Sequence, residues 1–140
     1  MNYKIVSKYI KDVSFEIAEA KSYFLLEKNI KNYTFVCDIK SKSIRDKIIQ
    51  VDVSLRLEPL DKNSDKNVYV SVELSSIIQI EGEVKKDELE KIVLIKVPTT
   101  VYPEIRNILI FLFEKSGFNK INIDHKIDFS KLYENRKNQK

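Results

Sequence analysis

One cysteine and one histidine, Cys37 and His125, are the residues with the most chemical potential in this chain. A zinc site needs about four Cys or His ligands, so one copy cannot build such a site from these residue types. A Cys–His catalytic pair could only join these two residues. Cys37 falls on the apolar side of an alternating segment, which favours a small buried hydrophobe over a nucleophile. His125 lies between Asp124 and Lys126, where an exposed side chain is expected.

Other catalytic constellations are also missing. The two glycines, Gly82 and Gly117, are too far apart for a phosphate-binding loop. The 21 acidic residues are scattered, and no carboxylate pair stands out for acid–base work. We therefore expect a protein that is not an enzyme and that uses no metal or cofactor.

Composition is typical of one globular domain spanning residues 1–140. Hydrophobic residues make up 43% and charged residues 33% of the chain, enough for a real core. The net charge is 25 − 21 = +4, spread along the chain. The N-terminal residues do not resemble a signal peptide, and the longest apolar run, 108–113, is too short to span a bilayer. We expect a cytoplasmic protein.

The alternation of apolar and polar residues predicts an antiparallel sheet of four strands. Apolar residues alternate over 13–17, 33–39, 49–58 and 68–80. A polar turn is expected over 61–67. Because strands come first and helices later, the fold class is α+β, with a long and a short helix on one face of the sheet.

Helices are predicted in the second half of the chain. Residues 85–96 should form a short helix that ends before Pro98, and a second helix should start at Pro103. Gly117 is placed to cap the second helix, and Asp128 to cap a last one. Residues 135–140 are expected to form a flexible tail.

The helix after Pro103 is apolar on too many sides for one sheet contact. Ile105 and Leu109 belong to one stripe, but other apolar side chains continue around the cylinder. We interpret the surplus as a homo-oligomer interface, while coverage by a loop or by the 85–96 segment remains the alternative. The candidate interface residues are Ile108, Phe111, Leu112 and Phe113.

Two ends of the chain resemble the SecB family of protein-export chaperones. The segments that carry the resemblance are Tyr9–Ile17, Tyr102–Arg106, Ser116-Gly117-Phe118, Ile121-Asn122-Ile123 and Asp128–Tyr133. The resemblance implies a four-stranded antiparallel sheet with a long and a short helix, assembled as a dimer of dimers. It also implies an ATP-independent chaperone (a holdase) that binds unfolded preproteins and passes them to the SecA motor.

By resemblance, the groove for clients involves the loop after the first strand, the second strand and the last helix. The implied client-binding residues are Tyr23, Phe24, Leu25, Phe35, Cys37, Ile39, Phe129, Leu132 and Tyr133. Plain core packing is the competing interpretation of the strand residues. The alternation by itself permits a peptide-binding surface without establishing one.

The implied SecA-docking residues are Asp12, Glu16 and Glu73, all on polar positions of their strands. Three features depart from the family: a basic net charge, Ser71 at a position that is acidic in the family, and a short C-terminal tail. Weaker complementarity to a basic motor segment is expected to slow docking.

Two other functions stay open. One is a SecB-like chaperone dedicated to a single client, such as the antitoxin of a toxin–antitoxin pair. The other is a basic nucleic-acid-binding module, in which stacking aromatics and cations would combine. Its candidate residues are Lys131, Tyr133, Arg136, Lys137 and Lys140. We favour the chaperone, because acidic residues interleave with the basic ones almost everywhere.

Overall fold

The computed structural model of the chain describes residues 2–59, 68–118 and 121–138. Its strands are β1 (Tyr3–Ile17), β2 (Tyr33–Arg45), β3 (Ile48–Pro59) and β4 (Val68–Ile80). Its helices are α1 (Ala20–Asn29), the 3₁₀ turn η1 (Ile30–Asn32), α2 (Lys86–Lys91), the π-helical η2 (Ile92–Lys96), α3 (Val97–Lys115) and α4 (Phe129–Asn138). The predicted α+β class is confirmed, whereas the expected turn over 61–67 lies outside the described residues.

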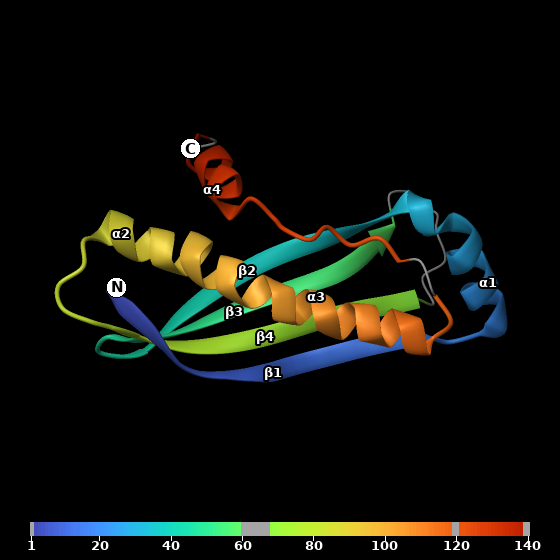
Figure 1. Cartoon of the computed structure of the whole chain (residues 1–140), viewed down its shortest axis with the longest axis horizontal. Coiled ribbons are helices and arrows are strands. Elements are labelled where there is room, and N and C mark those ends of the chain that lie inside the picture. Colours follow the sequence, from blue (N-terminus) through green and yellow to red (C-terminus); the bar gives the residue numbers. More distant parts are fainter. Residues whose placement is uncertain (1, 60–67, 119–120, 139–140) are drawn as a thin grey trace.

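The sheet has the strand order β1-β4-β3-β2, and all neighbouring strands are antiparallel. Strands β1 and β2 are therefore its two edges. Figure 1 shows α2 and α3 as one rod lying across a single face of the sheet, with α1 at one end. Apolar side chains of β3 and β4 pack beneath this rod, among them Val51, Val53, Leu55, Val70, Val72 and Ile78.

Strand β1 begins ten residues before Val13, where the alternation in the sequence becomes visible. Its register with β4 shifts between Ile5 and Ser7 and again between Ile10 and Asp12. Each shift is a β-bulge, and the extra residue reverses the inward and outward parity. The two bulges therefore interrupt the alternation, so the sequence pattern identifies only the last third of the strand.

The predicted break between two helices is wrong. Elements α2, η2 and α3 follow one another without a gap, so Pro98 and Pro103 both lie within the rod. Segment η2 is π-helical, and its carbonyl oxygens bond one residue further along than in an α-helix. Pro98 is the second residue of α3, one residue beyond this wider turn, and it has no backbone N–H to donate.

Two threonine hydroxyls also support this part of the rod. Thr99 Oγ1 donates a hydrogen bond to the Ile95 carbonyl oxygen at 2.6 Å, and Thr100 Oγ1 donates to that of Lys96 at 3.0 Å. Both are bonds from a threonine hydroxyl to the carbonyl oxygen four residues earlier in the chain. The backbone continues through both prolines as one helical rod.

The apolar side chains of α3 divide between the core and the surface. Phe113 is fully buried and meets the rings of Phe15, Phe35 and Phe118 edge-on, with centroids 5.1, 6.1 and 5.6 Å away. Phe113 was expected at an oligomer interface, and the structure corrects this: its side chain belongs to the core of one copy. Phe111, in contrast, is 56% exposed.

Both predicted caps are confirmed. Gly117 has φ +92, and a Cβ built there would lie 2.7 Å from the Tyr23 hydroxyl oxygen, so both the conformation and the space call for glycine. Asp128 Oδ1 accepts a hydrogen bond from the Lys131 amide at 3.0 Å at the start of α4. Helix α4 reaches Asn138, so it includes most of the segment expected to be a tail.

Candidate peptide-binding groove

A groove of about 490 Å³ lies between the β2 edge of the sheet and the extended segment 121–127. Its walls are mostly apolar, with Lys31, Thr34, Asn122 and Asp124 also taking part. The apolar lining residues are Ile30, Tyr33, Phe35, Leu55, Leu57, Tyr102, Ile121, Ile123 and Ile127. A groove of this composition suits apolar side chains of an extended polypeptide.

The first wall is built by β2, which is an edge strand. Phe35 and Tyr33 point to the helix side of the sheet, because they are paired with Leu57 and Pro59 of β3. Among the described residues, no strand pairs with the other edge of β2. Its main-chain groups can therefore pair with an added strand.

The second wall is held in place by α3. The Tyr102 hydroxyl donates a hydrogen bond to the Asp124 carbonyl oxygen at 2.6 Å, and Arg106 Nε donates to the Ile123 carbonyl oxygen at 3.0 Å. Burial raises the pKa of the Tyr102 hydroxyl, with Asp124 contributing. Ile123 is buried, whereas Ile121 stays half-buried beside the groove. The alternation of these two isoleucines is the one sequence signal that could have identified this wall.

Cys37 lies on β2, half-buried against the core, as its parity predicts. Burial, with a smaller contribution from Asp38, raises the pKa of its thiol to about 11. The thiol is therefore neutral at physiological pH and is a poor nucleophile. Ile39, two residues on, is also half-buried against the core, and neither residue lines the groove.

Helix α1 carries the predicted residues Tyr23, Phe24 and Leu25 and leads through η1 to the groove. Phe24 is 64% exposed and Leu25 is 38% exposed. The Tyr23 ring is half-buried and packs on Phe118, with centroids 5.1 Å apart. Two of the three side chains are thus open to a ligand near one end of the groove.

Helix α4 exposes fewer of the predicted client-binding side chains than expected. Phe129 and Tyr133 are buried: Phe129 packs edge-on against Tyr102, and the Tyr133 hydroxyl donates to Glu90 Oε2 at 3.0 Å. These two side chains attach α4 to the rod, so the structure corrects their assignment to a client surface. Leu132 remains exposed.

The face of the sheet opposite the rod is polar. The register places Asp12 directly across from Glu73, and Glu16 across from Tyr69. The three predicted acidic residues therefore share one face, with Asp12 and Glu16 exposed and Glu73 half-buried. Ser71 lies opposite Ser14, so no acidic pair forms there.

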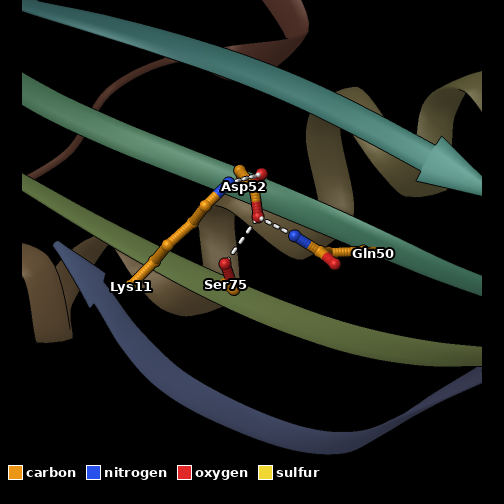
Figure 2. A network of polar contacts seen from close by, with 4 residues as sticks. All are labelled: Lys11, Gln50, Asp52 and Ser75. Atoms are coloured by element: carbon orange, nitrogen blue, oxygen red, sulfur yellow. Dashed lines mark hydrogen bonds and ion pairs between the residues drawn. The ribbon is translucent and has the colours of Figure 1, made fainter.

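A charged network that the sequence did not reveal lies beside these residues (Figure 2). Lys11 Nζ extends across β4 to Asp52 Oδ2 at 2.9 Å, and Asp52 Oδ1 accepts hydrogen bonds from Ser75 at 2.6 Å and Gln50 at 3.0 Å. Burial alone would raise the pKa of the Asp52 carboxyl, but these donors outweigh it and lower the pKa. The hydrogen bond to Asp52 raises the pKa of Lys11.

Other polar chemistry is sparse. In residues 2–59, 68–118 and 121–138, no group of three or more His, Cys, Asp or Glu side chains could hold a metal ion. No helix in the same ranges is long and apolar enough to cross a membrane.

Comparison with protein families gives a match over the whole length. The family model described as preprotein translocase subunit SecB matches residues 1–140. A SecB homologue of Pelagibacter ubique is 35% identical over 138 residues, covering 98% of each chain. The protein-export protein SecB of Rhodospirillum rubrum is 27% identical over 132 residues, covering 94% of this chain and 80% of the relative.

A solved structure shares the fold. It is a SecB-like chaperone of Mycobacterium tuberculosis in complex with a ChAD peptide from the HigA1 antitoxin. The TM-score is 0.63 at 11% identity, with 88% of this chain and 90% of that chain covered.

Proposed function

The chain belongs to the SecB family of protein-export chaperones, and on this premise we propose that it is an ATP-independent holdase for non-native polypeptides in the cytoplasm. Preproteins are its proposed clients. The observation that carries the proposal is the apolar groove with β2, an edge strand of the described sheet, as one wall. Main-chain pairing to an edge strand does not depend on the sequence of the client, and shallow apolar walls accept many side chains.

The exposed side chains of α1 extend the proposed client surface. Phe24 and Leu25 are large hydrophobics left in solvent near η1, which itself contributes Ile30 to the groove. An unfolded chain that leaves the groove at this end would cover them. Phe35 lines the groove and would contact a client there. Cys37 and Ile39 do not line the groove and would contribute only main-chain groups of the edge strand.

Delivery to SecA is the second part of the proposal. The outer sheet face with Asp12, Glu16 and Glu73 is the proposed docking surface. Its support is the register that aligns these carboxylates on one face. The basic net charge and Ser71 favour a docking affinity below that of an acidic relative.

Self-association, most simply a dimer of dimers, is also proposed. Exposed Phe111 and half-buried Ile108 lie on α3, and Ile108 shares a shallow pocket with Ile10 of the β1 edge. Ile10 and Val13 are also largely exposed, at 53% and 42%. Phe111→Asp should halve the mass in solution while the circular dichroism spectrum stays native; an unchanged mass would contradict this interface.

Isolation of a complex tests the holding function. A chemically unfolded secretory protein is diluted into this protein without nucleotide and separated by size. The secretory protein should coelute with the unchanged chain. It should also coelute with a control variant, Tyr69→Ser, which alters an aromatic side chain on the outer sheet face. The double variant Phe24→Ser, Leu25→Ser should lose most of the complex, and equal coelution of all three would contradict the proposed surface.

A dedicated client, such as an antitoxin, is the alternative. A dedicated chaperone would use the same groove, but it would bind one client and not many. The similarity to protein-export relatives over nearly the whole chain favours the general chaperone. A toxin–antitoxin gene pair next to this gene would favour the dedicated one.

A further inference from the structure

We propose that the turn region joining β2 and β3 docks on anionic phospholipid surfaces. Residues 40–47 contain the four cations Lys40, Lys42, Arg45 and Lys47 and a single acidic residue, Asp46. All of them are exposed. In Figure 1 this hairpin lies at the end of the sheet opposite α1, where it projects from the molecule.

The strand register gathers the cations on one face. Lys40 and Lys42 are paired with Asp52 and Gln50, whose side chains lie on the face opposite the rod. The register then shifts between Ser43 and Arg45, so a bulge turns Arg45 toward the same side. At this end of the sheet, Lys4 of β1 lies across from Gln79 of β4.

These cations are free to bind an external anion. Within the described part of the chain, Lys8, Lys11 and Arg56 form ion pairs, but the four hairpin cations form none. Asp52, the acidic neighbour of Lys40 in the register, is already bonded to Lys11. The hairpin therefore carries uncompensated positive charge, which an anionic lipid surface attracts.

An exposed apolar side chain selects a lipid surface over other polyanions. Ile44 lies between Lys42 and Arg45 at the bulge and is 47% exposed. An isoleucine flanked by cations can enter the headgroup region while the cations stay with the phosphates. A nucleic acid would call for stacking aromatics instead, and residues 40–47 contain none.

Co-flotation of the full chain with vesicles tests the proposal. We expect binding to vesicles of phosphatidylglycerol and phosphatidylcholine in equal parts, lost in high salt, and none to pure phosphatidylcholine. Neutralising two cations with Lys42→Gln, Arg45→Gln should weaken binding roughly thirtyfold, at about fivefold per cation. Ile44→Ser should weaken it about fivefold, because apolar burial is lost.

The matched control is Lys131→Gln, Arg136→Gln, which removes the same charge from exposed positions of α4 and should bind as the unchanged chain does. Equal loss in the control variant would overturn the proposal, because net charge alone would then explain binding. Displacement by an oligonucleotide, together with unchanged affinity of Ile44→Ser, would also overturn it, since the hairpin would then recognise nucleic acid. Circular dichroism of each variant establishes that the fold is intact.

Discussion

The Tyr102 hydroxyl donates a hydrogen bond of 2.6 Å to the main-chain oxygen of Asp124, and this bond joins the long helix to the far wall of the groove. Segment 121–127 has no regular secondary structure, so side chains of α3 must fix its position. Arg106 provides a second bond, to Ile123. Two polar contacts from one helix, together with the buried side chain of Ile123, thus attach this wall to the core.

Removing the first contact should loosen this wall. Tyr102→Phe is expected to cost about 1 kcal/mol of the free energy of unfolding, the net value of one hydrogen bond. Hydrogen exchange should accelerate at the amides of 121–127 more than elsewhere. Tyr69→Phe, an exposed tyrosine on the other face, is the control and should change neither quantity. Equal exchange rates at the amides of 121–127 in both variants would show that the bond does not position the wall.

Phe113 and Phe111 should respond differently to truncation. Phe113→Ala removes a fully buried ring that meets three other aromatic rings. The free energy of unfolding should therefore fall by about 3–5 kcal/mol. Phe111→Ala removes an exposed ring and should change the stability of one copy very little. Urea unfolding of both variants measures the difference. Similar losses would contradict the assignment of Phe113 to the core.

The network around Asp52 should make stability depend on acid. The folded-state pKa of Asp52 lies below its ordinary 3.8, so its contribution is present above that pH and is lost as the pH falls through the folded value. Asp52→Asn should cost about 1–3 kcal/mol at neutral pH and little in strong acid. Asp46→Asn, in the exposed turn, is the control. A difference that persists unchanged in strong acid would refute this explanation.

The Cys37 thiol should be unreactive in the folded protein. Its pKa of about 11 leaves almost no thiolate at neutral pH, and the side chain is half-buried. Reaction with a thiol reagent should be slow until the protein unfolds. Because the folded pKa is raised from 9.0 to about 11, stability should also decline between these two pH values. Rapid modification at neutral pH in the folded state would contradict this picture.

Charge reversal on the outer sheet face should separate docking from holding. Asp12→Lys with Glu16→Lys is expected to lower SecA affinity at least tenfold, because like charges then face a basic motor segment. Client binding should be unaffected. Glu81→Lys with Glu83→Lys makes the same charge change at exposed positions and should leave SecA affinity near its original value. Unaltered motor affinity in the first variant would remove the docking assignment.

The sequence predicted the sheet because most strands alternate cleanly, as the Val51, Val53 and Leu55 series does. It located only the last third of β1, residues 13–17, since the bulges at Val6 and Lys11 interrupt the alternation. It ended a helix before Pro98 because local rules for proline cannot anticipate the π-helical turn that precedes it. Prediction of strands and helices from local sequence patterns thus fails where the backbone is irregular, at the bulges of β1 and at the π-helical turn.

The groove was harder to predict than the fold. The resemblance named Phe35, which lines the groove, but one wall of the groove is an irregular segment bonded to side chains distant in sequence, such as Tyr102. The resemblance also implied Phe129 and Tyr133 as client contacts, although aromatic residues on a terminal helix suit either a surface or a core. Only the packing of α4 against the rod decides between these two roles.

Suppression of aggregation tests the central claim, that the groove holds non-native chains. A chemically unfolded secretory protein is diluted into stoichiometric amounts of this protein without nucleotide, and light scattering is followed. The unchanged chain and Tyr69→Ser should suppress scattering, whereas Phe24→Ser, Leu25→Ser combined with Ile121→Ser in a folded variant should not. Scattering that rises equally with and without the unchanged chain would contradict the claim, as would full suppression by the triple variant of α1 and the groove wall.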